Sequence, residues 1–413
     1  MDAREGALFL LDQVLARHRR MEAALEALPV TEARERGFAH LIAATVLRRL
    51  GSLDGVLDFH LKRGTPDPVR QVLRIGAAQL LFLGTPPHAA VATAVALARR
   101  TSEPHARLVN AVLRRVSETG AERLASLDAP RLDTPDWLWR SWWAAYGPAT
   151  YDIAAAHAIE PPLDLTPAPG ATPPEGALLL PTGSWRMPPG TSVTALPGFA
   201  EGLFWVQDAA AALPARLLGA RPGQQVVDLC AAPGGKTAQL ATAGASVTAI
   251  DREARRVETM RQNLARLRLS AETIAGDATK WRPPAPVDAV LLDAPCTATG
   301  TIRRHPDVAR LKQAREVADI IPLQDALLDA AARMLKPGGR LVYAVCSLQP
   351  EEGYARIEAA LSRLPLRLDP LSEAELAAVP QARDAHGCLR TLPCHWADKG
   401  GMDGFFAARL IRT

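Results

Sequence analysis

The chain has 413 residues, of which 48% are hydrophobic and 22% charged. This composition excludes a disordered chain, and the length is more than one ordinary core needs, so we expect a multidomain globular protein. No run approaches the ~18 apolar residues of a membrane span, and the first residues are charged, unlike a signal peptide. We therefore expect a soluble cytoplasmic protein with no membrane partner. Five cysteines are too few for a disulfide framework, which makes each thiol a candidate for chemistry.

The net charge of +4 is unevenly distributed. Residues 1–125 carry 18 Lys and Arg against 13 Asp and Glu, whereas the remainder carries 30 against 31. Only six of the 48 basic residues are Lys, and the planar Arg side chain suits phosphates and stacked bases. A coding bias toward Arg would give the same ratio, so charge alone only permits a nucleic-acid partner.

The first 120 residues have the periodicity of successive helices. Asp67 followed by Pro68 predicts a helix start, and the helical pattern then continues to Gly84. A second helix is expected from Ser102, with an apolar stripe formed by Leu108, Val112, Leu113 and Val116. We therefore expect an all-α bundle over residues 1–125. The Arg residues off the stripe are either a solvated face or an RNA-binding surface.

Composition changes after residue 124. Four Trp residues fall between positions 137 and 143, and ten Pro residues between positions 161 and 197. We expect residues 126–203 to form a small α+β connector with short strands. The Trp cluster favours a small hydrophobic core over a base-stacking surface.

The remaining residues, 204–413, alternate between strand and helix patterns. Strands are expected at residues 225–230, 247–251, 274–277, 287–293 and 339–346, a long helix at 311–335, and two closing strands between 389 and 410. This alternation predicts an α/β, Rossmann-like, doubly wound parallel sheet.

In such a sheet, ligands bind beyond the carboxyl ends of the strands. The residues expected there are three cysteines and four acids: Cys230, Cys296, Cys346, Asp228, Asp251, Asp277 and Asp293. An acid at each of several strand ends would be costly to bury unpaired, so the pattern implies a ligand.

The segment DLCAAPGGKT at 228–237 is the candidate cofactor turn. A phosphate-binding Walker loop would need Gly where Cys230 stands, and the dinucleotide fingerprint G-x-G-x-x-G is absent. A tight glycine turn at a helix start remains, with Asp251 placed for ribose hydroxyls and Asp277 for an adenine amino group. This pattern favours S-adenosylmethionine over NAD.

Cys296 and Cys346 follow two strands that we expect to be neighbours. A single such thiol would be a core cysteine in most proteins, but two beside a methyl donor favour methylation of a pyrimidine carbon. A thiolate that adds to C6 of cytosine makes C5 able to attack a methyl group, and a base must then remove the C5 proton. A nearby cation such as Lys236, or the sulfonium itself, could lower the pKa of the nucleophilic thiol.

At these positions the sequence resembles the RsmB-type rRNA cytosine-5 methyltransferases. The motifs occur in the order of that family: DLCAAPGGKT at 228–237, AID at 249–251, AGDAT at 275–279, LLDAPC at 291–296, TIRRHPD at 301–307, CSLQPEE at 346–352 and DGFF at 403–406. The N-terminal part is similar to the NusB-like RNA-binding domain of these proteins, through REGALFLLDQV at 4–14, AAQLLFL at 77–83 and LVNAVLRRV at 108–116.

The resemblance implies a role for each matching residue. Cys346 would be the nucleophile and Cys296 would assist resolution of the covalent adduct. The S-adenosylmethionine site would contain Cys230, Ala231, Ala232, Pro233, Gly234, Gly235, Lys236, Asp251, Asp277 and Asp293. Lys236, Asp293, Arg303 and Arg304 would contact the RNA substrate, which the NusB-like domain favours as small-subunit rRNA.

The chain departs from the family pattern at three places. Thr297-Ala298-Thr299 follows Cys296 where Ser-Gly is common, Ala344-Val345 precedes Cys346 where Ser-Thr is usual, and residues 162–166 replace an Arg-Val-Asn segment. We expect the changes beside Cys296 and Cys346 to affect rate and sequence context more than reaction type. The change at residues 162–166 leaves the RNA contacts of that region open.

Other functions stay open on the sequence. A tRNA cytosine-5 methyltransferase would need the same catalytic edge, and a NusB-like RNA-binding module could carry a vestigial methyltransferase fold. A nucleotide-dependent oxidoreductase is disfavoured because the dinucleotide fingerprint is absent. The group His386, Cys388, Cys394 and His395 matches no structural zinc spacing well, so no metal is expected. We expect a monomer.

Overall fold

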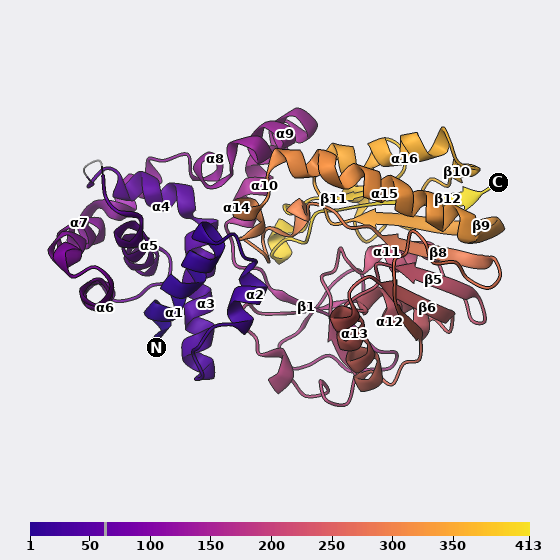
Figure 1. The fold of residues 1–413 in the computed structure, drawn as a ribbon, viewed down its shortest axis with the longest axis horizontal. Coiled ribbons are helices and arrows are strands. Elements are labelled where there is room, and N and C mark those ends of the chain that lie inside the picture. Colours follow the sequence, from indigo (N-terminus) through magenta and orange to yellow (C-terminus); the bar gives the residue numbers. More distant parts are fainter. Residues whose placement is uncertain (62–63) are drawn as a thin grey trace. The chain divides into compact units, whose positions relative to one another are not determined.

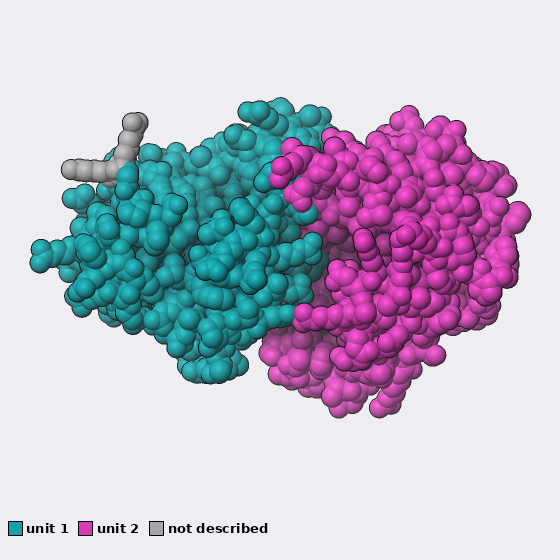
Figure 2. Space-filling view, viewed as in Figure 1, with its two compact units in different colours: residues 1–159, 302–313 teal, residues 160–301, 314–413 magenta. Residues whose placement is uncertain are grey.

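The computed structural model describes residues 1–61 and 64–413, which form two compact units (Figure 2). Unit 1 consists of Met1–Ile159 with Ile302–Gln313, and unit 2 of Glu160–Thr301 with Ala314–Thr413. The expected connector over residues 126–203 is therefore divided between the two units, and a segment from the second half of the chain belongs to unit 1. Within the described ranges, no helix is long and apolar enough to cross a membrane.

Unit 1 is helical, as predicted. Its α-helices are α1 (Ala3–Leu11), α2 (Met21–Glu26), α3 (Ala33–Arg48), α4 (Leu50–Leu57), α5 (Asp67–Leu81), α6 (Pro87–Thr101), α7 (Ala106–Ala125), α8 (Ala129–Asp133), α9 (Asp136–Tyr146), α10 (Ala149–His157) and α14 (Val308–Leu311) (Figure 1). A continuous apolar core runs through α1 to α7. Helix α1 begins with a capping box, in which the Asp2 carboxylate accepts from the Glu5 amide and the Glu5 carboxylate accepts from the Asp2 amide.

The apolar stripe of α7 differs from the predicted one by one residue. Leu108 is 36% exposed, whereas Val109 is fully buried. The helix begins at Ala106, so the buried positions run Val109, Val112, Leu113 and Val116, at spacings of three and four residues. The prediction that Leu108 belongs to the stripe was wrong because sequence periodicity did not fix the phase of the helix.

The Trp cluster is only partly a core. Trp142 is fully buried, but Trp143 is 46% exposed. Trp143 stacks on Trp139 with ring centroids 6.2 Å apart, and the edge of Tyr151 contacts both rings. Helix α9 therefore anchors itself in unit 1 through one Trp and keeps a second near the surface.

Unit 2 begins with a small antiparallel sheet in the proline-rich segment, as predicted. Its strand order is β2-β3-β1-β4, with bounds β1 (Leu163–Pro167), β2 (Leu178–Leu179), β3 (Trp185–Met187) and β4 (Phe204–Val206). A buried ion pair joins two of these strands, with Arg186 Nε 2.6 Å from Asp164 Oδ1. Asp164 also accepts a hydrogen bond from the amide of Ala209, so it ties the small sheet to the chain that follows.

The large sheet of unit 2 has the order β10-β12-β9-β8-β5-β6-β7, with β11 paired to β12. Five strands are parallel, as predicted: β5 (Gln225–Leu229), β6 (Ser246–Asp251), β7 (Glu272–Ala275), β8 (Val287–Asp293) and β9 (Leu335–Val345). β10 (Leu366–Leu368), β11 (Leu389–Thr391) and β12 (Phe405–Arg412) are antiparallel additions. The sheet is therefore mixed, because β12 returns along β9 to close the fold.

Helices cover both faces of this sheet. Alternate strand residues point to opposite faces, so Val227 packs with α15 (Ala314–Met334) and α16 (Tyr354–Leu361). Val226 packs on the other side with α11 (Leu213–Leu218) and α12 (Gly235–Thr242), and α13 (Ala254–Arg266) lies farther along that face (Figure 1).

Three predicted boundaries were wrong. β7 ends at Ala275, so Asp277 lies in the turn beyond the strand, where its carboxylate accepts from Thr279. β9 begins at Leu335 rather than 339, with an irregular register beside β8. The helix expected over 311–335 begins at Ala314 as α15, because Leu311 ends the separate short helix α14 and residues 312–313 are not helical.

Candidate active site

The strand order of the parallel sheet reverses between β5 and β8. From β5 it proceeds outward through β6 and β7, and it then returns to place β8 and β9 on the other side of β5. The crevice at the carboxyl ends of these strands is where open α/β sheets bind ligands. The turns after β5, β6, β8 and β9 carry most of the predicted site residues.

The glycine turn after β5 is locked to the end of β6. Gly234 adopts a φ of 100°, and a Cβ there would lie 2.7 Å from Cγ of Met260, so only glycine fits without displacement. The amide of Ala232 donates to Asp251 Oδ2 at 3.1 Å, and Asp251 is 3% exposed. The structure thus brings together the predicted turn and the predicted ribose-binding acid.

Lys236 and Asp293 form an ion pair at the start of α12 and the end of β8. The distance between Lys236 Nζ and Asp293 Oδ2 is 2.7 Å. Burial disfavours the ammonium form, but the Asp293 carboxylate outweighs it and the pKa of Lys236 is raised. Lys236 also lies over the ring of Phe405 at 5.3 Å, and it interacts electrostatically with Cys346. A charged ammonium therefore lies within electrostatic range of the predicted nucleophile.

The two predicted catalytic thiols are in contact. Sγ of Cys296 lies 3.5 Å from Sγ of Cys346, and both residues are partly exposed. The hydrogen bond between the two thiols and burial raise the pKa of Cys296 well above its usual range. Cys296 therefore stays a thiol in contact with Cys346, and the roles of the two cysteines stay a prediction.

The loops that carry these cysteines pack against each other without intervening side chains. The amide of Gly300 donates to the carbonyl of Cys346 at 3.0 Å, and the amide of Gly404 donates to the carbonyl of Gly300 at 2.8 Å. A Cβ on Gly300 would lie 1.9 Å from the Gly404 carbonyl oxygen. Ala298 adopts a φ of 59°, a left-handed conformation that favours the glycine common in the resembling family.

Cys230 and Asp277 are two further residues of the predicted cofactor site with a shifted pKa. Cys230 adopts a φ of 60° directly after β5, and burial raises its pKa, so it stays neutral. Asp277 is exposed, and its hydrogen bonds with Thr279 lower its pKa. Asp277 is therefore a charged carboxylate at the open rim.

The two arginines predicted to contact RNA lie in the part of unit 1 contributed by residues 302–313. Arg303 is 2% exposed, and its carbonyl accepts a hydrogen bond from Arg48 at 3.0 Å. Arg304 is half-buried. The burial of Arg303 does not favour direct RNA contact, and the role of both residues stays a prediction.

Sequence reasoning did not single out three residues that the structure places at the site. Phe405 lies under the Lys236 ammonium, while Glu352 and Gln324 hydrogen-bond to the cysteine loops. Glu352 and Phe405 belong to the motifs CSLQPEE and DGFF, which the sequence analysis had recognised. The sequence around them did not indicate which residues they contact. Gln324 is one polar residue within a long amphipathic helix, and no sequence signal marks it.

Two residues of the group weighed as a zinc site, His386 and Cys388, make other contacts. The ring of His386 stacks on Tyr354 with centroids 3.5 Å apart, and Cys388 is buried in the core. Across residues 1–61 and 64–413, the structure brings together no three His, Cys, Asp or Glu side chains able to hold a metal ion.

The fold and the strand-end site define a Rossmann-like methyltransferase attached to a NusB-type helical region. The sequence model of the family described as 16S rRNA methyltransferase RsmB/F matches residues 215–411, and that of the NusB family matches residues 1–118. Because a protein named Ribosomal RNA small subunit methyltransferase B is more than a third identical along the full length of this chain, the chain belongs to that family.

Relatives along the whole chain support this assignment. The Ribosomal RNA small subunit methyltransferase B of Pseudomonas putida is 38% identical, covering 100% of this chain and 99% of that protein. The protein of the same name from Vibrio cholerae is 36% identical over 89% of this chain and 86% of its own length.

Solved structures show the same architecture. The crystal structure of PH0851 has a TM-score of 0.74 at 24% identity and covers 99% of both chains, which shows the fold. A methyltransferase homolog protein from Pyrococcus horikoshii has a TM-score of 0.54 at 26% identity, covering 66% of this chain and 94% of its own.

Proposed function

We propose that this chain methylates C5 of a cytosine in small-subunit rRNA, with S-adenosylmethionine as the methyl donor and a covalent adduct between Cys346 and C6 of the base. The observation that carries this proposal is the 3.5 Å contact between the Cys296 and Cys346 sulfur atoms, beside a lysine that interacts with Cys346. The relatives named above act, by their names, on ribosomal RNA of the small subunit.

The residues at the strand ends fit S-adenosylmethionine, which supplies the methyl group when bound. The turn at Gly234 opens helix α12 without a phosphate-binding loop, as a cofactor lacking pyrophosphate requires. The carboxylate of Asp251 at the end of β6 is the group expected to accept hydrogen bonds from ribose hydroxyls. Asp277 at the rim would meet the adenine amino group.

The two thiols and the ion pair have complementary tasks in this reaction. The Cys346 thiolate adds to C6 of the cytosine, C5 takes the methyl group, a base removes the C5 proton, and the bond between sulfur and C6 then breaks. The Lys236 ammonium interacts electrostatically with Cys346, so a positive charge is present where the thiolate reacts. The thiol of Cys296 donates to the departing sulfur and so assists resolution. Lys236 and Asp293 would also polarise the edge of the target base.

The first test is Cys346→Ala. Methyl transfer to rRNA should be abolished, while S-adenosylmethionine still binds in isothermal titration calorimetry, because the thiol attacks the base and does not hold the donor. Cys394→Ala, which changes a half-buried thiol to which the proposal gives no role, is the matched control and should keep activity. Full activity in Cys346→Ala, or a methyl group at a position other than C5 in nucleoside mass spectrometry, would overturn the mechanism.

The second test is Cys296→Ala. Without the proton donor, the departing thiolate is less stable, so a covalent complex of protein and RNA should accumulate. Denaturing gel electrophoresis with labelled RNA detects this complex. The double variant that also lacks Cys346 should show none. Absence of the complex in Cys296→Ala would remove the role assigned to Cys296.

The RNA substrate is tested separately from the chemistry. Bisulfite mapping of total RNA, with and without the gene, should locate the methylated cytosine in small-subunit rRNA, whereas a tRNA position would favour the alternative substrate.

The excess of basic residues in 1–125 supports RNA docking by the NusB-like region, and its contribution to affinity should fall steeply with salt. A vestigial methyltransferase fold would bind RNA but no cofactor. Because one chain supplies every proposed catalytic group, we propose that the protein acts as a monomer. We also propose that it acts in the cytoplasm.

A further inference from the structure

Beneath the two catalytic cysteines lies a fully buried carboxylate, that of Glu352. Glu352 is 0% exposed and sits in the short 3-10 helix Pro350–Glu352 after β9. A charged group is costly to bury unless its hydrogen-bonding capacity is filled. The contacts of Glu352 therefore indicate what it does.

One side of the carboxylate holds the loop of Cys296. The backbone amide of Thr297 donates to Glu352 Oε2 at 2.9 Å, and the Thr297 hydroxyl donates to Oε1. The side-chain amide of Gln324 donates both to Oε2 at 3.2 Å and to the carbonyl of Pro295 at 2.9 Å. The residues on both sides of Cys296 are thus held through one carboxylate.

The other side holds the loop of Cys346. The Ser347 hydroxyl donates to Glu352 Oε1 at 3.0 Å, and Ser347 is fully buried. The Tyr343 hydroxyl in β9 donates to the carbonyl oxygen of Glu352 at 2.8 Å, which fixes the backbone of the short helix under the strand. Glu352 therefore contacts the residue that follows each cysteine.

Four hydrogen-bond donors satisfy the carboxylate of Glu352. Oε1 accepts from two hydroxyls and Oε2 from two N–H groups, which is the full acceptor capacity of an ionised carboxylate. The four donors are neutral groups from three chain segments: the Cys296 loop, helix α15 and the Cys346 loop. A buried carboxylate satisfied in this way positions loops more firmly than a flexible ion pair would.

We propose that Glu352 is the positioning residue that sets the separation of the Cys296 and Cys346 sulfur atoms, and hence the rate of the methyl-transfer cycle. The effect on the rate rests on the proposed function, whereas the effect on the separation of the two sulfur atoms does not. Misplacement of a reacting group by about 1 Å can lower a rate ~10²-fold, so loosening either loop should affect catalysis more than binding.

The variants separate hydrogen bonding from charge. In Glu352→Gln, the amide oxygen can still accept from Thr297 N and Gln324, while the amide NH₂ donates to the two hydroxyls, which can turn to accept. In Glu352→Ala, all four bonds are lost. Thr297→Val, a milder variant, removes only the hydroxyl and keeps the backbone bond. Glu351→Ala changes the exposed neighbouring acid and is the matched control.

The first readout is kinetic. For Glu352→Ala we expect kcat to fall ~10²-fold, with KM for RNA and the affinity for S-adenosylmethionine within about threefold of the unchanged protein. Glu352→Gln should recover kcat to within about tenfold, and Thr297→Val should fall between the two. A merely structural role would lower the amount of folded enzyme, visible in thermal unfolding, without this split between kcat and KM.

The second readout does not depend on methyl transfer. The oxidant diamide takes two electrons and two protons from a pair of thiols, which become a disulfide, while diamide is reduced to the corresponding hydrazine. Peptide mapping by mass spectrometry measures the rate at which Cys296 and Cys346 become linked. Thiols 3.5 Å apart should link fast in the unchanged protein and in Glu351→Ala, more slowly in Glu352→Ala, and at a recovered rate in Glu352→Gln.

The outcomes are distinct. Unchanged linking rate and unchanged kcat in Glu352→Ala would overturn the proposal, as would a Glu352→Gln variant no better than Glu352→Ala in both readouts. If the unchanged protein forms no 5-methylcytosine, the proposed function fails, yet the diamide experiment still decides whether Glu352 positions the thiols. If Glu352→Ala does not fold, Thr297→Val carries the same comparison.

Discussion

At the scale of single residues, the acid at the end of β5 has an unusual environment. Asp228 is fully buried, and the Thr237 hydroxyl donates to its Oδ2 at 2.6 Å. Burial is the main cause that raises the pKa of Asp228 to about 7, and the carboxylates of Asp293 and Asp251 act in the same direction. The folded protein thus holds a proton on this group at pH values where the unfolded chain has released it.

This difference predicts a pH-dependent stability. The contribution of Asp228 is fully present below its ordinary pKa of 3.8 and is lost as the pH rises to about 7. The side chain of Asn does not ionise, so Asp228→Asn should not lose stability as the pH rises. Relative to the unchanged protein, its free energy of unfolding should be higher between pH 5 and 8, by up to about 4 kcal/mol. Urea unfolding across this pH range measures the difference.

The exposed residue Asp319 provides the comparison for this experiment. Asp319→Asn should leave the pH profile of the unfolding free energy unchanged. Parallel profiles for Asp228→Asn and the unchanged protein would show that Asp228 is ionised in the folded state.

At the scale of elements, the loop from 297 to 301 combines two backbone requirements. Gly300 must lack a side chain because the Gly404 carbonyl lies against it. Ala298 has a left-handed φ of 59° although it carries a Cβ. The sequence comparison had marked Ala298 as a departure from the resembling family, and the structure gives the departure a physical consequence, which is local backbone strain.

Relief of this strain should be measurable. A left-handed alanine costs about 1–2 kcal/mol, and the greater freedom of glycine in the unfolded chain offsets part of that, so Ala298→Gly should raise the free energy of unfolding by about 0.5–1 kcal/mol. Chemical unfolding in urea measures it. Ala326→Gly, within the right-handed helix α15, should instead lower stability by about 1 kcal/mol. A loss of stability in both variants would contradict the assignment of strain to residue 298.

The parallel strands of unit 2 were predictable because each is a short apolar run bounded by turn residues. The order of these strands and the antiparallel additions were not, since strand order depends on pairing between distant segments, such as Val226 with Ala289 and Arg340 with Ile411. The position of Asp277 was misjudged for a local reason: the polar turn Gly276-Asp277 follows an apolar run whose end the pattern did not mark.

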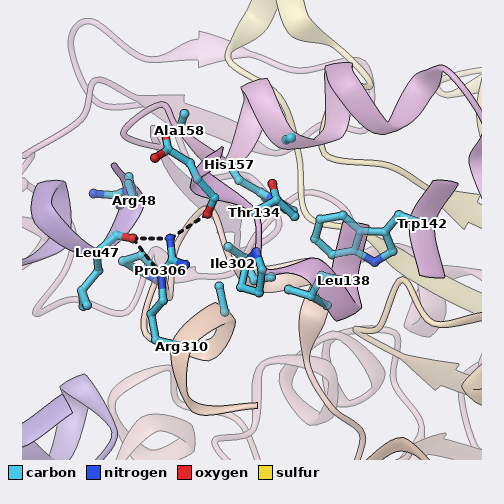
Figure 3. A pocket seen from close by; sticks show the side chains of 14 residues that line it. Leu47, Arg48, Thr134, Leu138, Trp142, His157, Ala158, Ile302, Pro306 and Arg310 are labelled. Carbon is cyan, nitrogen blue, oxygen red and sulfur yellow. Dashed lines mark hydrogen bonds between the residues drawn. The ribbon is translucent and has the colours of Figure 1, made fainter. Parts of the chain in front are cut away.

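At the scale of the whole molecule, unit 1 is assembled from two distant parts of the chain. In unit 1, the guanidinium of Arg310 donates to the carbonyls of Leu47 at 3.1 Å and Asp133 at 2.6 Å (Figure 3). A small cavity of about 20 Å³ lies beside it, room for about one water molecule, and Trp142 and Ile302 contribute to its wall. The amide of Met21 also donates to Asp307 at 2.9 Å, so helix α2 is held by the same segment.

We therefore expect Arg310→Met to destabilise unit 1. The substitution leaves two buried carbonyl groups without their donor, which costs about 1–3 kcal/mol. Thermal unfolding should show a lower midpoint, with the loss confined to the helical unit in hydrogen exchange. Arg333→Met, which changes an exposed arginine of α15, should leave the midpoint unchanged. An unaltered midpoint in Arg310→Met would mean that residues 302–313 add little to unit 1.

The sequence by itself determined the helical first part, the parallel strands, and the acids and thiols at the strand ends, because periodicity and turn residues are local properties. Only the tertiary structure placed residues 302–313 in the helical unit, brought the two sulfur atoms within contact and set Glu352 beneath both loops. These features depend on long-range hydrogen bonds between segments that are far apart in the chain, and no local pattern encodes such partners.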